Sequence, residues 1–401
     1  MKIIATTLFG LESLVREDLT RAGYSYENIK VSDGVVTLDA GDDTWEEDVA
    51  RVNMWVRRAE RVFFEVGSFP ASAFEEFFDK ANALPWNDFI PKGYAITVNG
   101  YSRKSKLYGI SALQSLSKKA IIRSLLASRG LPENGIISED KNIGEVRVQF
   151  GIVEDNVRFM IDTSGDGLHK RGYRPLTHEA PIRETLASAM VSLSRFRPFS
   201  YEAMVDPFCG SGTILIEAAL MATGRAPGRD RHFSYEDLPY IGSYAYKKAR
   251  EEAIDLEDMT PPDDLFLFGS DIDRNAVESA KRNAETAGVS GFIKFGVADA
   301  ETRTPSSLTS VTGFNRQLIL TNPPYGGRLM TPEEADEIYR MIARTYLTKQ
   351  GLCRKGIRLS VISPDDTFEV ATGFKADKRT KLYNGNIKCQ LNNYYRLGEK
   401  D

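Results

Sequence analysis

Four residues with distinctive chemistry, Asn322, Pro323, Pro324 and Tyr325, come just after the apolar run Leu318–Leu320. Proline has no N–H group and restricts the residue before it, so the chain must leave a sheet here as a stiff, extended turn. The amide oxygen of Asn322 and the carbonyl oxygen of Pro323 can both accept hydrogen bonds from one exocyclic amine, and the Tyr325 ring can stack on the base that carries this amine. The turn therefore predicts a site that holds a planar NH2 group. A Pro-rich loop that only caps a parallel strand would have the same residues.

A second motif lies between a short apolar strand, 203–205, and a helix over 214–221. Its glycines let the backbone approach a ligand closely, and the helix N-terminus offers free N–H groups. Such a loop would also serve a dinucleotide enzyme, or form only a tight turn. The carboxylate of Asp206 favours a ligand with a positive ammonium and sulfonium over a pyrophosphate. The residues assigned to this cofactor site are Asp206, Pro207, Gly210, Gly212 and Thr213.

Another buried strand, 266–269, is followed by two carboxylates. Asp271 is placed to accept hydrogen bonds from both hydroxyls of a ribose, whereas Asp273 is expected to be the N-cap of a helix over 274–287. Ile272, between them, is assigned to the same ligand site. The pattern predicts that these residues bind the ribose of the same ligand that the glycine loop approaches.

A third strand, 292–297, leads to Asp299 and Ala300, which are assigned to the same site with Asp299 bonded to an adenine amine. The stretch that separates the first carboxylate motif from the second is much longer than the roughly 30 residues of a dinucleotide-binding βαβ unit. An insertion over about 224–264 is therefore expected to loop out.

The composition is that of an ordinary soluble globular protein, because 42% of its 401 residues are hydrophobic and 27% are charged. This length predicts two or three domains. No apolar run reaches the roughly 20 residues that span a bilayer, and Met1–Ala5 lacks the apolar core of a signal peptide, so a cytoplasmic protein without a membrane partner is expected. Scattered cysteines and histidines predict neither a disulfide framework nor a metal site. These residues are Cys209, Cys353, Cys389, His169, His178 and His232.

Basic residues gather in two stretches although the net charge is −4. Between Tyr101 and Gly130 there are seven basic residues and no acidic one, whereas a solvated helix face normally mixes both signs. Thr163–Pro175 is typical of a domain boundary but has more cations than a plain linker needs. Both stretches predict contacts with nucleic-acid phosphates. The candidate contacts are Arg103, Lys104, Lys106, Lys118, Lys119, Arg123, His169, Lys170, Arg171, Tyr173 and Arg174.

Hydrophobic periodicity predicts the elements that position these residues. The first α+β unit has a strand over 3–8, a helix over 10–22, a strand–turn–strand over 31–38, a helix over 46–61 with its arginines outside, and a strand over 62–66. A second unit has helices over 71–83 and 109–129 and strands over 94–101, 146–152 and 156–163. The basic residues of the long second helix must face outward, because its leucines and isoleucines form a buried face.

In this order the motifs resemble those of an S-adenosylmethionine-dependent amino-methyltransferase: Asp-Pro-Phe-Cys-Gly-Ser-Gly-Thr (206–213), Asp-Ile-Asp (271–273), Asp299 and Asn-Pro-Pro-Tyr (322–325). The chain is most similar to the THUMP-domain family that methylates N2 of guanine in 23S ribosomal RNA. The resemblance also covers the segments 53–61, 168–174 and 374–385.

The resemblance implies an α/β fold class with several domains. These are a ferredoxin-like segment (1–62), a THUMP RNA-binding domain (63–163), a basic linker (164–182) and a Rossmann-like class I methyltransferase domain (183–401) with the insertion at about 224–264. Seven strands are expected in the last domain, the last one antiparallel. Some members carry a second methyltransferase domain at the C-terminus; because this chain stops at its residue 401, only the guanine activity is expected.

The implied enzyme uses S-adenosylmethionine to methylate the exocyclic N2 of a guanine in 23S ribosomal RNA or a large-subunit precursor. No strong base is required, because positioning and two hydrogen-bond acceptors lower the barrier. Arg328 is expected either to contact a phosphate or to form a salt bridge inside its loop. The implied catalytic residues are Asn322, Pro323, Pro324 and Tyr325, with Asn322 also in the cofactor site, and the further RNA contacts are Lys378 and Arg379.

Three alternatives remain open from the residues. The same reaction on transfer RNA is the nearest, since THUMP domains commonly recognise that substrate. A ribosome-assembly factor that binds RNA without catalysis belongs to another class, and the retained carboxylates and Asn322 argue against it. Asn-Pro-Pro-Tyr alone also fits a DNA adenine methyltransferase, although no DNA-reading module is evident. The residues predict no particular oligomeric state.

Overall fold

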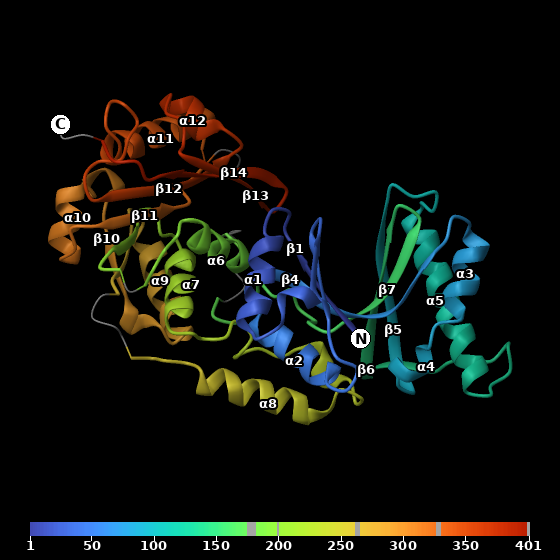
Figure 1. Cartoon of the computed structure of the whole chain (residues 1–401). Coiled ribbons are helices and arrows are strands. Elements are labelled where there is room, and N and C mark those ends of the chain that lie inside the picture. Colours follow the sequence, from blue (N-terminus) through green and yellow to red (C-terminus); the bar gives the residue numbers. More distant parts are fainter. Residues whose placement is uncertain (175–181, 199, 261–264, 326–329, 399–401) are drawn as a thin grey trace.

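The computed structural model describes residues 1–174, 182–198, 200–260, 265–325 and 330–398, and it contains two seven-stranded sheets. Figure 1 shows the second sheet and its helices at one end of the molecule, the segment from α3 to β7 at the other, and the first N-terminal elements between them. The half that contains the second sheet and the segment from α3 to β7 are thus separate parts of the structure, connected by the first N-terminal elements.

The first sheet has the strand order β2-β3-β1-β4-β7-β6-β5. All neighbouring pairs are antiparallel except β5 with β6. The strands are β1 (Lys2–Thr7), β2 (Ile29–Ser32), β3 (Val35–Asp39), β4 (Ala59–Pro70), β5 (Gly93–Arg103), β6 (Glu139–Val153) and β7 (Asn156–Asp162). The helices of this half are α1 (Glu12–Arg21), α2 (Trp45–Trp55), α3 (Phe74–Asn82), α4 (Trp86–Phe89) and α5 (Ile110–Ser128).

The long strand β4 joins the two expected N-terminal units into one sheet. Its first half pairs with β1, and its second half pairs with β7, with an irregularity between Glu65 and Gly67. The ferredoxin-like elements and the following α+β elements therefore share backbone hydrogen bonds across the expected boundary near residue 62.

The expected helix over 46–61 is wrong at its end, because α2 stops at Trp55 and β4 begins at Ala59. The backbone N–H groups of Arg57 and Arg58 donate to Asp18 Oδ2 at 2.9 and 3.0 Å, which replaces helical partners. Both arginine side chains are buried, so the expectation that they lie on an outer helix face is also wrong. Their burial depends on acidic partners from α1 and α7, which no local pattern reveals.

The second sheet has the order β10-β9-β8-β11-β12-β14-β13 and confirms the Rossmann-like architecture. Strands β8 to β12 are parallel, and β14, the last strand of the chain, is antiparallel to β12 and β13. The strands are β8 (Ala203–Asp206), β9 (Leu267–Asp271), β10 (Ile293–Val297), β11 (Gln317–Thr321), β12 (Ile357–Pro364), β13 (Lys378–Asn384) and β14 (Ile387–Tyr394). The helices are α6 (Glu184–Leu193), α7 (Thr213–Ala222), α9 (Arg274–Thr286), α10 (Pro305–Thr312), α11 (Pro332–Tyr346) and α12 (Thr367–Thr372).

Strand β11 shows why its apolar run has no polar alternation. Leu318 and Leu320 pack on the side of α6 and α7, whereas Ile319 packs on the side of α11 and α12. Because helices cover both faces of this parallel sheet, every residue of the strand is buried.

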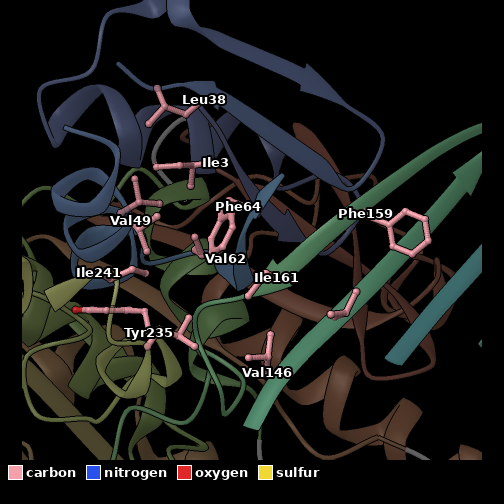
Figure 2. Close-up of a cluster of buried hydrophobic side chains, with 14 of the residues drawn as sticks. Ile3, Leu38, Val49, Val62, Phe64, Val146, Phe159, Ile161, Tyr235 and Ile241 are labelled. Carbon is pink, nitrogen blue, oxygen red and sulfur yellow. The ribbon is translucent and has the colours of Figure 1, made fainter. Parts of the chain in front are cut away.

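The insertion does leave the Rossmann-like domain, and its helix α8 (Gly242–Asp255) packs against the N-terminal half rather than into solvent. Tyr235 and Ile241 join one hydrophobic cluster with Val62 and Phe64 of β4 (Figure 2). The pair Arg51–Glu252, 2.6 Å apart, and the pair Lys248–Glu47 add charged contacts between α2 and α8. The insertion therefore fixes how the two halves meet.

Candidate cofactor and amine-binding site

The site forms where β8 and β11 lie side by side. The strands β9 and β10 extend the sheet on one side of this pair and β12 extends it on the other, so a crevice is expected at their carboxyl ends. Asp206 ends β8 and Asn322 follows β11, and Thr321 Oγ1 donates a hydrogen bond of 2.7 Å to Asp206 Oδ1. The two motifs that the sequence placed far apart are therefore neighbours.

The glycine loop wraps the end of β8 and leads into α7. The N–H group of Gly210 donates to Asp271 Oδ2 at 3.0 Å, which ties the loop to β9. Gly210 has φ +51° and a side-chain carbon there would meet nothing within 4 Å, so open space lies over its backbone. Gly212 has φ +80°, and a Cβ there would come within 3.0 Å of Ala280 Cβ. Gly210 thus leaves room for a ligand, and Gly212 lets α7 pack closely on α9.

Asp206 is almost completely buried, with 2% of its surface exposed. Burial raises the pKa of its carboxyl group to about 7, although hydrogen bonds from Thr321 and the N–H group of Phe208 oppose the shift. Nearby Asp271 raises the pKa further by its negative charge. A positively charged ligand group beside Asp206 would favour the ionised carboxylate, which suits the expected ammonium and sulfonium.

The remaining carboxylates follow the neighbouring strands. Asp271 Oδ1 accepts the N–H group of Asp273 at 3.0 Å, and Asp273 caps α9 through the N–H group of Asn275, which confirms its expected role. Asp299 caps the short 3-10 turn Ala300–Thr302. Val297 of β10 lies beside Asp271 in register, so the two candidate nucleoside contacts sit on adjacent strand ends, with the side chain of Ile272 exposed next to them.

The Asn-Pro-Pro-Tyr turn leaves the buried end of β11. Asn322 Oδ1 is buried and has no hydrogen-bond partner among the residues that the structure describes. An unsatisfied buried acceptor costs roughly 1–3 kcal/mol, so it suits a donor brought by a ligand. Tyr325 is half-buried, and its hydroxyl accepts a 2.7 Å hydrogen bond from Asn384 Nδ2 of β13, which fixes the ring position. Arg328 lies outside the described residues.

The comparison with protein families matches two parts of the chain. A model described as "RMKL-like, methyltransferase domain" matches residues 171–393, and one described as "RlmL ferredoxin-like domain" matches residues 2–63. The chain belongs to the RMKL-like methyltransferase family. The glycine loop, the carboxylates and the Asn-Pro-Pro-Tyr turn all lie inside the larger match.

Relatives of this family cover nearly the whole chain. YpsC of Bacillus subtilis, an RNA methyltransferase by name, is 36% identical over 98% of this chain and 95% of its own. Ribosomal RNA large subunit methyltransferase K/L of Vibrio parahaemolyticus is 31% identical over 98% of this chain, which spans only 53% of that longer protein. The solved structure of SMU.472, a methyltransferase by name in complex with SAH, has a TM-score of 0.85 and 33% identity, and the match covers 100% of this chain and 99% of that one.

S-adenosylmethionine is therefore the cofactor, and the donor set fits it. The open space over Gly210, the buried carboxylate of Asp206 and the strand-end carboxylates Asp271 and Asp299 offer a backbone approach, a partner for positive charge and acceptors for hydroxyl and amine groups. Asn322 follows β11 at the same edge of the sheet.

The structure separates the predicted RNA contacts into two groups. Arg171 and Tyr173 are buried and bond Glu217 of α7, with 3.4 Å from Arg171 Nε and 3.2 Å from the Tyr173 hydroxyl to Glu217 Oε1. Arg174 donates to Glu184 Oε1 at 2.9 Å and to Thr213 Oγ1 at 3.1 Å. These three side chains hold the linker against the catalytic domain. Because Arg171 and Tyr173 are buried there, the prediction that they contact RNA is wrong.

The other candidates lie nearer the surface, and several of them pair with acidic side chains. Lys118 pairs with Glu139, Arg123 with Glu133, Lys104 with Glu154, His169 with Glu60, Lys170 with Asp166 and Arg379 with Glu369. The side chains of Arg103, Lys106, Lys119 and Lys378 are exposed. His178 lies outside the described residues, and His232 pairs with Glu236 and Asp237.

Two site residues, Thr321 and Asn384, were absent from the sequence assignment. Thr321 directly precedes Asn322, and its hydroxyl at the buried end of a strand was a local signal. Asn384 is 59 positions from Tyr325 and meets it only through the antiparallel end of the sheet.

The described residues contain neither a candidate membrane span nor a candidate metal cluster. No helix among them is long and apolar enough to cross a membrane. Within the same ranges, no group of three or more His, Cys, Asp or Glu side chains is arranged to hold a metal ion.

Proposed function

We propose that this chain methylates the exocyclic N2 of a guanine in 23S ribosomal RNA or in a large-subunit precursor. The observation that carries the proposal is the buried Asn322 Oδ1, which lacks a partner among the described residues beside the cofactor site. It is supported by relatives named as an RNA methyltransferase and as a large-subunit ribosomal RNA methyltransferase, the second of which is about twice as long as this chain.

The chain's own residues position the amine. S-adenosylmethionine supplies an electrophilic methyl group on a positively charged sulfur, which keeps the electron pair of the bond that breaks. Asn322 Oδ1 and the Pro323 carbonyl accept the two N–H groups, favour a more tetrahedral nitrogen and so free its lone pair from the ring. The nitrogen forms the new bond to carbon, and the proton it loses passes to water. Tyr325, held by Asn384, stacks on the base.

The RNA contacts in this proposal come from the basic side chains that are at least partly exposed. They lie on β5, the loop after it, α5, the basic linker and β13, and the segment 63–163 acts as a THUMP RNA-binding domain. The proposed set is Arg103, Lys104, Lys106, Lys118, Lys119, Arg123, His169, Lys170, Lys378 and Arg379.

The proposal is tested by nucleoside mass spectrometry and primer-extension mapping of ribosomal and transfer RNA from a deletion strain. We expect one N2-methylguanosine of 23S ribosomal RNA to disappear, and to return with the wild-type gene but not with Asn322→Ala. Loss of a transfer RNA N2-methylguanosine instead would identify transfer RNA as the substrate. Loss of an N6-methyladenosine would identify the adenine amine as the methylated group. No change in any RNA, together with no binding of S-adenosylmethionine in calorimetry, would exclude the enzyme.

A further inference from the structure

Phe9, in the loop between β1 and α1, lies where three distant elements meet. Its ring is 46% exposed and is not part of a hydrophobic cluster among the described residues. The ring centroid lies 6.5 Å from that of Tyr383 in β13, at an interplanar angle of 64°, and the guanidinium carbon of Arg103 at the end of β5 lies 5.7 Å from it. A Cβ on Gly34, in the turn between β2 and β3, would lie 3.5 Å from the ring.

One side of Phe9 leads to the catalytic turn. Tyr383 precedes Asn384, whose side chain donates to the Tyr325 hydroxyl at 2.7 Å. Lys381 Nζ lies 5.6 Å from the centroid of the Tyr383 ring. The backbones of the two halves also touch here, because a Cβ on Gly10 would come within 2.9 Å of the Lys381 carbonyl oxygen. Tyr383 and Asn384 are successive residues of β13, so their side chains point to opposite faces of the strand, and Phe9 and Tyr325 lie on either side of its end.

The other side of Phe9 leads into a groove of about 910 Å³ between the β2–β3 turn and the ends of β5, β6 and β7. Residues that line it include Asp33, Tyr101, Arg103, Lys104, Glu154 and Arg158. Lys104 pairs with Glu154 at 3.4 Å, and Arg158 pairs with Glu65 at 3.1 Å. Arg103 makes no ion pair with any residue in the described ranges, so its charge is directed at the Phe9 ring and the groove.

These contacts match the surface that binds single-stranded nucleic acid: a groove with cations for the phosphates and exposed aromatic rings on which bases stack. Resting on the function proposed above, we infer that a single-stranded segment of the RNA substrate runs from this groove across Phe9 to the catalytic turn. One base stacks on the Phe9 ring, and Arg103 and Lys381 contact the phosphates on either side. The target base can then enter the site at Tyr325 while its neighbours stay bound to the N-terminal half.

The test compares Phe9→Leu, which keeps apolar volume but loses the aromatic face, with Phe9→Tyr, which keeps the ring. Tyr26→Leu is the matched control, because Tyr26 is 58% exposed and also carries an arginine, Arg16, over its ring, on another part of the same half. The probe is a 23S ribosomal RNA fragment that wild-type protein methylates. We expect Phe9→Leu to raise its Kd and KM about tenfold with kcat unchanged, since stacking on an aromatic side chain contributes about this factor or more per base.

Phe9→Tyr and Tyr26→Leu should bind the fragment like the wild type, and all three variants should keep the Kd for S-adenosylmethionine. A Phe9→Leu variant that binds and methylates the fragment as the wild type does overturns the inference. If that variant is unstable, Arg103→Gln is the second test. The salt dependence of RNA binding, measured as the slope of log K against log salt concentration, should decrease in magnitude by about one. An unchanged slope overturns the inference. Failure of the wild type to methylate any RNA would instead defeat the proposed function itself.

Discussion

Asn322 combines two properties at the residue scale: a buried acceptor without a partner in the described structure, and a backbone fixed by the prolines that follow. Both matter for catalysis, because an acceptor held in place requires no reorganisation when the amine nitrogen changes shape. An amide oxygen also cannot compete for the proton as a strong base would.

Asn322→Ala should therefore lower kcat by about 100-fold to 1,000-fold, the range found when one preorganised hydrogen-bonding group is removed from a reacting centre. The Kd for S-adenosylmethionine should change far less, because the carboxylates Asp206, Asp271 and Asp299 and the glycine loop are the main cofactor contacts that we propose. Rates with the mapped RNA fragment and calorimetry provide the two measurements. Asn384→Ala is the comparison that loosens only Tyr325, and its loss should be smaller. Full activity of the Asn322→Ala protein would show that Asn322 does not bind the amine.

Asp206 gives a prediction about pH. Its pKa of about 7 in the folded protein is above the usual carboxyl value, so the folded state holds a proton that the unfolded chain has released. This group's contribution to stability is therefore present below the unfolded pKa and is lost as the pH rises through about 7. The affinity for a positively charged ligand changes with pH in the opposite direction: it rises with pH, because such a ligand binds the ionised carboxylate more tightly.

The affinity for S-adenosylmethionine should accordingly be about tenfold weaker at pH 6 than at pH 8, as the ionised fraction of Asp206 changes by that factor for a pKa near 7. Calorimetry at several pH values measures it. Asp206→Asn should bind the cofactor more weakly at pH 8 and remove this pH dependence. The same slope in Asp206→Asn would assign the titration to a different group.

At the scale of elements, the loop between β8 and α7 contains two glycines with positive φ that serve different purposes. Gly210 faces open space, whereas Gly212 faces Ala280 of α9. An alanine at either position carries the strain of a left-handed backbone, about 1–2 kcal/mol. Only the alanine at position 212 also presses α7 away from α9.

Gly212→Ala should therefore lower the free energy of unfolding more than Gly210→Ala does, and Gly210→Ala should be the variant that loses cofactor affinity out of proportion to its stability. Chemical denaturation and calorimetry on the two variants test this. Equal stability losses, or an unchanged cofactor Kd in Gly210→Ala, would contradict the division of roles.

At the scale of the whole molecule, a buried ionic network joins the two halves. Glu217 of α7 is fully buried and contacts Arg57, from the segment between α2 and β4, and Arg171 and Tyr173, from the linker. Burial lowers the pKa of Arg57 to about 10 and raises that of Tyr173 well above its usual value. Charged groups in such a place depend on each other to remain ionised.

Glu217→Gln should reduce the free energy of unfolding by about 3–5 kcal/mol, because it leaves two buried arginines short of a counter-charge. Denaturant unfolding followed by tryptophan fluorescence measures it. The matched control is Glu17→Gln, which breaks the exposed pair with Arg21 and should change stability by less than about 1 kcal/mol. Equal effects of the two changes would show that the network does not stabilise the joint.

Much of the fold and the site could be predicted from the sequence because their signals are local. A buried parallel strand is a continuous apolar run, and the polar residue after it must lie at the carboxyl edge of the sheet. This places Asp206, Asp271, Asp299 and Asn322 together once their strands are known to be neighbours. Asp273 is likewise an N-cap by its position before a helix.

Only the tertiary structure decided which of the predicted surface residues are buried. Arg57, Arg58, Arg171 and Tyr173 follow the same local pattern as surface residues, and their burial depends on Asp18 and Glu217 from distant segments. The contact of Asn384 with Tyr325 and that of Tyr383 with Phe9 likewise depend on where β13 lies at the end of the second sheet. Sequence by itself determined which groups end each strand, because that is fixed by neighbours along the chain; which charges meet solvent depends on neighbours in space, and only folding brings those together.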